Sequence, residues 1–317
     1  MESKNNWKAW LYLAPVLILL AVFTFYPIIN TFYVSFLKDY NYITGASKGF
    51  TFDNYIAVLT PYSSLGGGLN SMFDKVMKTA LPNTLLITII TVPISIILSL
   101  ANAIALNSIK VLKKLFQTVF FMPYVTNAIA IGMVFTVIFD ADYGIFNSMF
   151  GSQGFPWIFK SPSHPDVLVN YWSALFALCF YIVWHSLPYK ILIFLGGLQN
   201  IDAQYYDAAK IDSAPKWKTT LKITVPLLSP QILYMMITSF IGAFKEYNSV
   251  IGLFGSSGGS FNKDTGPANM STMVFFIYQQ VAANKVHYAS AASIFLFLII
   301  MLFTVVQNKV SKKRVHY

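Results

Sequence analysis

The sequence has little of what soluble enzymes and secreted domains use. Its single cysteine, Cys179, lies within an apolar run, which excludes an intramolecular disulfide framework. Charged residues make up 11% of the 317 residues, and the acidic sign is the scarcer: 12 Asp and Glu against 22 Lys and Arg. The four histidines are scattered without ligand spacing, and no carboxylate pair or Ser-His-Asp order stands out. We therefore expect no metal, no cofactor and no enzymatic chemistry in this chain.

Two binding signatures are also absent. The chain has no Gly-x-x-x-x-Gly-Lys-Ser/Thr phosphate loop, so ATP hydrolysis, if it is used, must belong to another subunit. No RNA- or DNA-binding motif appears, and the net charge of +10 is not gathered in a soluble basic domain. Nucleic acid is therefore not an expected partner, and the basic residues are better explained as topology signals.

Apolar residues are what the chain has in excess. Hydrophobic residues make up 56% of it and aromatics 17%, with a mean hydropathy of +0.58, which a water-soluble domain could not carry without large exposed apolar patches. The apolar runs are helix-length, and a spanning helix needs roughly 20 apolar residues. The sequence therefore predicts an all-α, polytopic membrane protein with six spans. They are expected at 10–33, 83–106, 115–138, 170–198, 226–252 and 287–307.

Charge distribution orients these spans. Lys and Arg are denser in the segments that lie inside if the N-terminus is inside, such as Lys113-Lys114 and the run Lys312-Lys313-Arg314. The positive-inside rule then places both termini in the cytoplasm. The first apolar stretch is too long for a signal-peptide core and has no small-x-small cleavage site, so we expect it to be the first span.

A charged, small-residue-rich segment lies between the fourth and fifth predicted spans. It runs Tyr206-Asp-Ala-Ala-Lys-Ile-Asp-Ser-Ala-Pro215 and continues to Pro226. It closely resembles the EAA loop of binding-protein-dependent ABC transporter permeases, Glu-Ala-Ala-x-x-Asp-Gly-Ala and, after a spacer, Ile-x-Leu-Pro. The residues in register are Ala208, Ala209, Asp212, Ala214, Ile223 and Pro226, and the departures are Asp207 for Glu, Ser213 for Gly and Val225 for Leu.

The resemblance implies that this segment is a helix that seats in a groove of an ATP-binding subunit. The implied ATPase-coupling residues are Asp207, Ala208, Ala209, Asp212, Ser213 and Ala214. Asp202 can cap the helix. Ala203, Ala208 and Ala209 would present a face of small side chains that another protein can approach closely. Glycine would allow positive φ at the turn, whereas Ser213 must avoid that conformation or be strained by it. The alternative is a solvated loop with an incidental acidic residue.

The fourth span contains Ile182-Val-Trp-His-Ser-Leu-Pro-Tyr-Lys190. Pro188 removes a backbone donor, so we expect a kink, and irregular backbone at membrane depth is tolerated where it faces protein or a cavity. In the maltose-type permeases the similar stretch lines the sugar site, which implies His185, Ser186 and Tyr189 as substrate-binding residues. Trp184 matches too but need not point inward. The alternative is that Ser186 and Tyr189 only satisfy hydrogen bonds between helices.

The fifth span contains Thr238-Ser-Phe-Ile-Gly-Ala-Phe-Lys-Glu-Tyr-Asn248. On a continuous helix Lys245 and Glu246 project about 100° apart and do not pair with each other directly. Each is costly in lipid, so they should face a cavity, a partner chain or the outer interface. Resemblance adds Ser239, Gly242, Ala243 and Glu246 to the substrate-binding residues. Lys190 and Lys245 could favour an anionic sugar. The alternative is that these lysines snorkel to the membrane surface or form an ion pair with Glu246.

The resemblance covers about residues 80–310 and extends to the first span through Tyr12-Leu-Ala-Pro15 and Tyr26-Pro27. We predict residues 1–80 to be an N-terminal helix and an extracytoplasmic loop, 81–310 to be the permease core with the EAA loop at 200–230, and 311–317 to be a basic cytoplasmic tail. The family implied is the maltose and glycerol-phosphate type of carbohydrate importer in the bacterial cytoplasmic membrane. Its implied partners are a second permease of similar fold, two ATP-binding subunits, an extracytoplasmic solute-binding protein, membrane lipid and a sugar that crosses by alternating access.

Two other functions are possible from the same residues. A proton-coupled secondary transporter could use Glu246 or His185, although no inverted repeat is apparent and the Asp207 helix would have no purpose. A membrane scaffold without transport would leave the polar residues within the spans unexplained.

Overall fold

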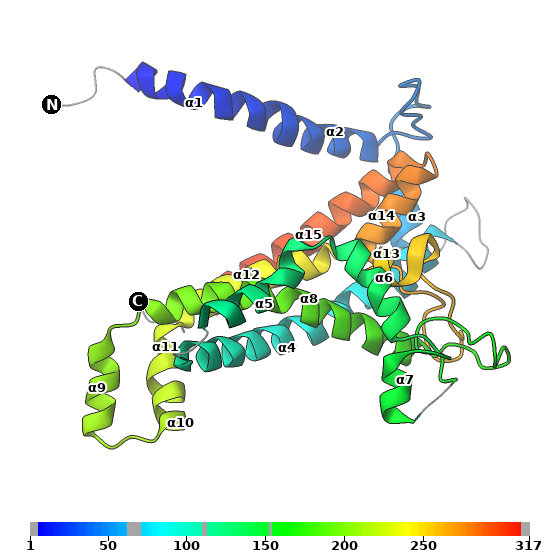
Figure 1. Ribbon diagram of the computed structural model, residues 1–317. Coiled ribbons are helices and arrows are strands. Elements are labelled where there is room, and N and C mark those ends of the chain that lie inside the picture. The colour runs from blue at the N-terminus through cyan, green and yellow to red at the C-terminus, as the bar shows by residue number, and fades with distance from the viewer. Residues whose placement is uncertain (1–5, 62–70, 110–112, 152–153, 312–317) are drawn as a thin grey trace. The chain divides into compact units, whose positions relative to one another are not determined.

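The computed structural model describes residues 6–61, 71–109, 113–151 and 154–311. These residues are mostly helical, and their only strand-like pairing is an isolated bridge between Leu37 and Phe50 (Figure 1). The chain divides into two compact units. One contains Met1–Met77 with Phe276–Leu298, and the other contains Lys78–Phe275 with Ile299–Tyr317. The second unit contains the segments singled out in the sequence.

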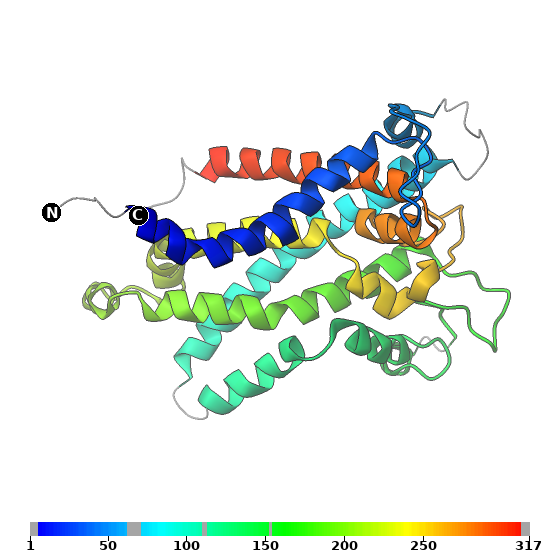
Figure 2. The ribbon, with the colours of Figure 1, turned by 90° about the horizontal axis from the view of Figure 1, so that it is seen from above.

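The predicted six spans are present as four continuous apolar helices and two bent pairs, each pair counted as one span. The continuous ones are Trp10–Ser35, Asp74–Ser108, Tyr171–Gln199 and Val286–Lys309. They are built from α1 (Asn6–Leu20), η1 (Ala21–Phe25), α2 (Tyr26–Ser35), η2 (Asp74–Ala80), α4 (Leu81–Ser108), α8 (Tyr171–Gln199) and α15 (Val286–Ser311). Within the second unit α4 packs against α8, which it crosses obliquely, and this is the most extensive helix pair (Figure 2).

The third span is not the continuous helix that the sequence predicts. α5 (Lys113–Val125) and α6 (Ala128–Ile138) meet at a bend of 103°. Pro123 lies in the last turn of α5, and the Asn127 side chain caps α6 by accepting hydrogen bonds from the backbone N–H groups of Ile129 and Ala130. An asparagine at the N-cap position is a helix start signal, and here it interrupts an otherwise uniform apolar run.

The fifth span is broken twice, where the sequence predicts one helix over 226–252. α10 (Lys216–Thr219), η3 (Thr220–Thr224) and α11 (Val225–Leu227) lead to a bend of 67° before α12 (Ser229–Phe244). Pro230 lies in the first turn of α12, where its missing N–H costs nothing. α12 ends at Phe244, and a separate helix, α13 (Asn248–Phe254), follows after a short break. The polar run at 245–248 is therefore a break within the apolar sequence.

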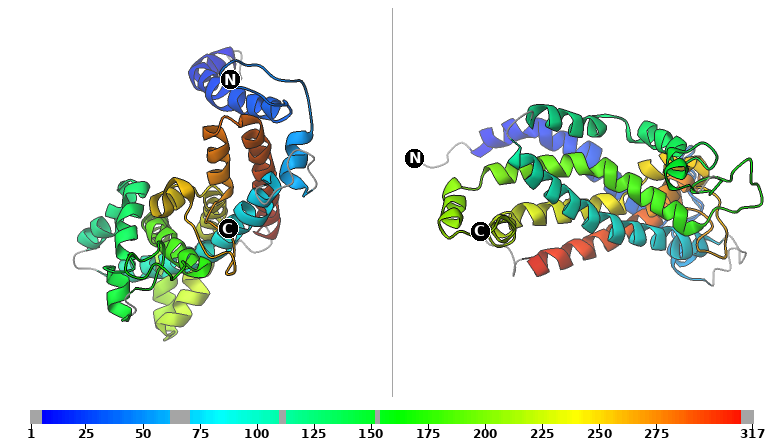
Figure 3. Two further views of the ribbon diagram at one scale, coloured as in Figure 1. Left: turned by 90° about the vertical axis from the view of Figure 1, so that its right-hand side faces the viewer. Right: turned by 60° about the horizontal axis from the view of Figure 1, so that its bottom comes forward.

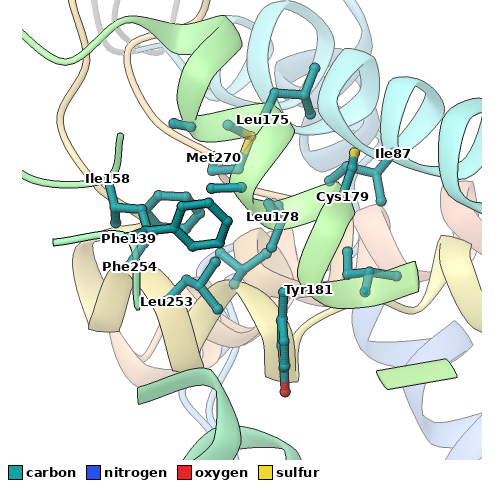
Figure 4. Packing of buried hydrophobic residues seen from close by; sticks show 14 of the residues in the cluster. Ile87, Phe139, Ile158, Leu175, Leu178, Cys179, Tyr181, Leu253, Phe254 and Met270 are labelled. Carbon is teal, nitrogen blue, oxygen red and sulfur yellow. The ribbon is translucent and has the colours of Figure 1, made fainter. Parts of the chain in front are cut away.

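Two apolar clusters hold the second unit together. The first joins α6, α8 and α13 around Phe139, Leu178 and Leu253, and it includes buried Cys179 (Figure 4). The second joins α4, α8 and α12 around Val92, Phe194 and Met235. The orientation of these helices is fixed by their packing against one another and not by an apolar stripe in each sequence, because most of their faces are equally apolar.

Short helices complete the two units. α3 (Asp53–Leu59) belongs to the first unit, where Asn54 Nδ2 donates to the carbonyl oxygens of Ser35 and Leu37. α7 (Ile145–Phe150) lies at one end of the second unit, and α9 (Ala203–Ile211) lies beyond the other end of α8 (Figures 1 and 3). The remaining elements are η4 (Gly255–Ser257) and α14 (Met273–Ala282). From residue 312 on, the predicted basic tail lies outside the described residues.

Candidate functional site

A cavity of 280 Å³ lies within the second unit, between α4, α5, α8, α12 and the break after α12. Every residue that the sequence proposed for substrate binding lines it, although they come from two spans separated by the whole coupling segment. These seven residues are His185, Ser186, Tyr189, Ser239, Gly242, Ala243 and Glu246. The other lining residues are Thr91, Val92, Ser95, Tyr124, Ile182, Lys190 and Thr238.

α8 supplies the aromatic and imidazole groups of the wall. Its helix continues through Pro188, so the proline does not break it as the bend at Asn127 breaks the third span. The Tyr189 ring stacks on the ring of Tyr124 with centroids 5.5 Å apart, and its hydroxyl lies 3.4 Å from that of Tyr234. His185 Nε2 is buried and has no hydrogen-bond partner among the residues that the structure describes. A buried polar atom without a partner is costly, so a group in the cavity is the natural partner for it.

Two residues of the same stretch are engaged elsewhere. The Ser186 hydroxyl donates to the carbonyl oxygen of Val183, 2.9 Å away, which is a bond within α8 and not the bond between helices that the alternative explanation predicted. Ser186 nevertheless lines the cavity, and its hydroxyl oxygen accepts a hydrogen bond of 3.2 Å from Lys190 Nζ. Trp184 is not among the lining residues and packs against Phe135, with ring centroids 5.1 Å apart and ring planes tilted by 53°.

α12 supplies a wall of small side chains. Ser239, Gly242 and Ala243 follow at helical spacing and so share one face. A Cβ placed on Gly242 would meet no atom within 4 Å, so the glycine leaves open space at the wall. Small residues on this face widen the cavity that larger ones would fill.

Lys245 and Glu246 do not lie on a continuous helix as the sequence analysis assumed. They form the break between α12 and α13, so their separation is set by the turn and not by a helical step. Glu246 lines the cavity, and its Oε1 accepts a hydrogen bond of 3.0 Å from the backbone N–H of Ser249 in the first turn of α13. Lys245 is exposed and does not line the cavity. Among the described residues Glu246 has no lysine partner within salt-bridge distance, so that alternative is not realised.

α4 and α5 contribute residues that sequence reasoning missed. α4 carries buried hydroxyl residues at helical spacing, and of these Thr91 and Ser95 reach the cavity. The full series is Thr84, Thr88, Thr91, Ser95 and Ser99. Three of the threonine hydroxyls donate to carbonyl oxygens four residues earlier, which satisfies them within the helix. The i, i+3/i+4 spacing of these hydroxyl residues was a signal in the sequence that could have identified Thr91 and Ser95. No such signal pointed to Tyr124 on α5.

The second candidate site is the segment around α9. Asp202 caps the helix as predicted, accepting a hydrogen bond of 3.0 Å from the backbone N–H of Gln204. At the other end Ser213 takes φ of +53°, so the serine adopts the conformation for which glycine is usual. The N–H of Ala214 donates to the Ala209 carbonyl and that of Ser213 donates to the Lys210 carbonyl. This pair of bonds is a Schellman motif, which ends the helix in a defined turn.

The predicted coupling residues divide by exposure. Asp207, Ala208, Asp212 and Ser213 are exposed, and Asp207 pairs with Lys210 at 2.7 Å. Ala209 is buried and Ala214 half-buried, and both line a cavity of 310 Å³ between α9 and the end of α4. Ala209 therefore packs against its own chain instead of contributing to a face of small side chains that another protein can approach. Two exposed apolar residues that the sequence analysis did not select, Ile211 and Trp217, lie at 85% and 62% exposure in the same segment.

Comparison with known proteins defines the class of this molecule. The sequence model of the binding-protein-dependent transport system inner membrane component family matches residues 100–317, and the chain belongs to that family. The family and the apolar helices make it a multi-pass membrane protein and the permease component of a transport system.

Individual relatives cover nearly the whole chain. The arabinooligosaccharides transport system permease protein AraP of Bacillus subtilis is 30% identical, over 95% of this chain and 88% of its own length. The lactose transport system permease protein LacF of Rhizobium radiobacter is 29% identical, over 93% and 90%. The sn-glycerol-3-phosphate transport system permease protein UgpA of Rhizobium meliloti is 28% identical, over 99% and 97%. A solved bacterial ABC transporter that imports alginate shares the fold, with a TM-score of 0.70 and 18% identity over 98% of this chain and 96% of its own.

Proposed function

We propose that this chain is the membrane subunit of an ATP-driven importer that moves a sugar across the bacterial cytoplasmic membrane by alternating access. The permease family supports the importer, and the names of relatives that carry lactose and arabinooligosaccharides support a carbohydrate substrate. The absence of a phosphate loop in the sequence assigns ATP hydrolysis to a separate subunit.

The cavity is the observation that carries the proposal. Hydroxyl, imidazole and carboxylate groups converge on it from three helices, and Tyr189 and Tyr124 add flat apolar faces. Ligand sites combine apolar walls with a few placed polar groups, and a sugar needs both, because it has hydroxyl edges and C–H faces. The residues His185, Ser186, Tyr189, Ser239, Gly242, Ala243 and Glu246 are accordingly proposed to bind the sugar.

The exposed residues of α9 are the proposed contact with an ATP-binding subunit. Ile211 and Trp217 would extend that contact, because exposed apolar side chains next to a charged helix are typical of protein interfaces. One such subunit would bind this chain and another a second permease of similar fold. A solute-binding protein would deliver the sugar at the opposite end of the second unit, near α7 (Figure 1). Both termini would lie in the cytoplasm, as the distribution of Lys and Arg predicts.

Reconstitution tests this proposal. The purified chain should co-purify with an ATP-binding subunit. The rate of ATP hydrolysis by that subunit should rise when the sugar-loaded binding protein is added. Replacement of residues 207–214 by a neutral linker should abolish both that rise and uptake, whereas the same replacement at the exposed loop 42–47 should leave both in place. Retained uptake without residues 207–214 would contradict the proposed coupling.

The unpartnered His185 Nε2 favours one second candidate, a proton-coupled carrier. The two functions separate in one measurement. An ATP-driven importer keeps transporting when an uncoupler collapses the proton gradient at constant ATP, whereas a proton-coupled carrier stops. Loss of uptake in that condition would replace our proposal by the carrier.

A further inference from the structure

Lys190 is a buried cation without an anionic partner. Its side chain is 7% exposed, in the middle of a membrane span, and its Nζ donates to the hydroxyl oxygens of Ser95 and, at 3.2 Å, Ser186. Among the described residues no carboxylate lies within salt-bridge distance of it. Two neutral hydroxyls do not offset the loss of hydration of an ammonium group, because a buried charge requires a countercharge or water.

A ligand in the cavity is the remaining source of a countercharge for Lys190. Lys190 lines the cavity together with its two hydroxyl partners, so a ligand there can reach the ammonium group, which has three donors and uses two of them on serines. Ser95 on α4 and Ser186 on α8 hold the Nζ from two helices. A cation fixed in this way is prepared for an anion and loses little side-chain freedom when the anion binds.

Glu246 lies too far along the cavity to serve as that countercharge. Gly197 of α8 packs against Leu228, just before α12, which sets the level of the two antiparallel helices. Counted from that level at 1.5 Å per helical residue, Lys190 is about 10 Å along α8, whereas α12 ends at Phe244, about 24 Å along, and Glu246 follows that end. The Glu246 carboxylate is also engaged by the N–H of Ser249. The two charges therefore mark opposite ends of one cavity.

We propose that the cavity takes a sugar bearing an acidic group, a carboxylate, sulfonate or phosphate, and that Lys190 binds that group at the end nearer α9. The hydroxyls of the same sugar would then reach toward His185 and Glu246 at the other end, where Nε2 lacks a partner. This inference rests on the proposed function of the cavity and narrows its substrate class.

A matched pair of probes tests it on the assembled importer in lipid nanodiscs. The probes are a neutral disaccharide of glucose and the same disaccharide with one residue oxidised to glucuronate. The wild-type complex should bind the acidic probe at least about tenfold more tightly, since a charge-assisted hydrogen bond contributes on the order of 1.5 kcal/mol or more. Lys190→Met should bring the two affinities together, and Lys190→Arg should keep most of the preference.

Lys245→Met is the matched control, because it removes the same charge from a lysine that does not line the cavity, and it should keep the wild-type preference. Equal binding of the two probes by the wild type, or a preference that Lys190→Met leaves unchanged, would overturn the acidic substrate while the sugar site stands. Binding of neither probe by an assembled wild-type complex that hydrolyses ATP would count against the cavity as the sugar site. A Lys190→Met complex that fails to assemble, while Lys190→Arg assembles without any acidic preference, would make the lysine a structural tie between α4 and α8.

Discussion

Ser213 shows how a single residue stores strain in the α9 segment. Its φ of +53° costs a serine about 1 kcal/mol relative to glycine, because Cβ then approaches the following carbonyl. The sequence correctly identified the two options for this position, and the Schellman hydrogen bonds of Ser213 and Ala214 decide between them by fixing the turn. The strained conformation is tolerated because those bonds satisfy the end of the helix.

Ser213→Gly should therefore stabilise the protein. We expect a gain of about 1 kcal/mol, reduced somewhat by the greater freedom of glycine in the unfolded chain. Thermal unfolding of the purified chain in detergent measures it. Ser163→Gly, at an exposed loop position with no positive φ, should lower stability slightly instead. A loss of stability in Ser213→Gly would contradict the strain argument.

Asp39 gives a pH-dependent contact in the loop after the first span. The hydrogen bond from Lys48 Nζ, at 2.8 Å, is the main reason that the pKa of Asp39 lies below its ordinary value. A lowered carboxyl pKa means that the contact stabilises the loop above the ordinary pKa of about 3.9 and is lost as pH falls through the lowered one.

The predicted observable is hydrogen exchange at the Lys48 N–H, which donates to the Lys38 carbonyl across the same loop. Its protection should be constant from neutral pH down to about 4 and weaken below. Asp39→Asn should remove the pH dependence. An unchanged profile in that variant would show that another group controls the loop.

At the scale of elements, the crossing of α6 and α13 depends on glycine. A Cβ on Gly132 would lie 2.7 Å from the Cα of Gly252, which is backbone and cannot turn aside. The two helices approach this closely only because neither has a side chain at the crossing, as small residues allow in membranes. The sequence placed both residues in apolar runs without any sign that they meet.

Gly132→Ala should therefore force α6 and α13 apart and destabilise the second unit by about 1–3 kcal/mol. Gly196→Ala is the matched control, a helical glycine of α8 whose Cβ would meet nothing within 4 Å, and it should be neutral or stabilising. Thermal unfolding of both variants in the same detergent compares them. Equal stability of the two variants would refute the close crossing.

At the scale of the whole molecule, the orientation predicted from Lys and Arg can be tested with cysteines. The only native cysteine, Cys179, is buried, so it gives a low background for labelling. Tyr143 is 90% exposed near α7, and Ile211 is 85% exposed at the end of α9. Tyr143→Cys should react with a membrane-impermeant thiol reagent in intact cells. Ile211→Cys should react only in inside-out vesicles stripped of peripheral proteins, and the reverse pattern would invert the topology.

The sequence could predict much of the candidate site because it resembles the maltose-type permeases. That resemblance implied one set of residues on the fourth span and another on the fifth, and all seven line one cavity: His185, Ser186, Tyr189, Ser239, Gly242, Ala243 and Glu246. Tyr124, Thr91 and Ser95 could not be assigned to the cavity in this way. Helical spacing places Thr91 and Ser95 on one face of α4, but the packing of the helices decides which faces of α4 and α5 turn toward α8.

Composition and length alone determined that this chain crosses a membrane as helices, because lipid leaves no other way to satisfy so much apolar backbone. The local signals of Asp202, Pro215 and Pro226 likewise determined the bounded α9 segment. Only the tertiary structure decided that Lys190 lies beside Ser95 and that, among the described residues, no carboxylate lies within salt-bridge distance of it. The physical reason is that caps and hydrogen bonds are local, whereas the partners of a buried charge are chosen by how separate helices pack.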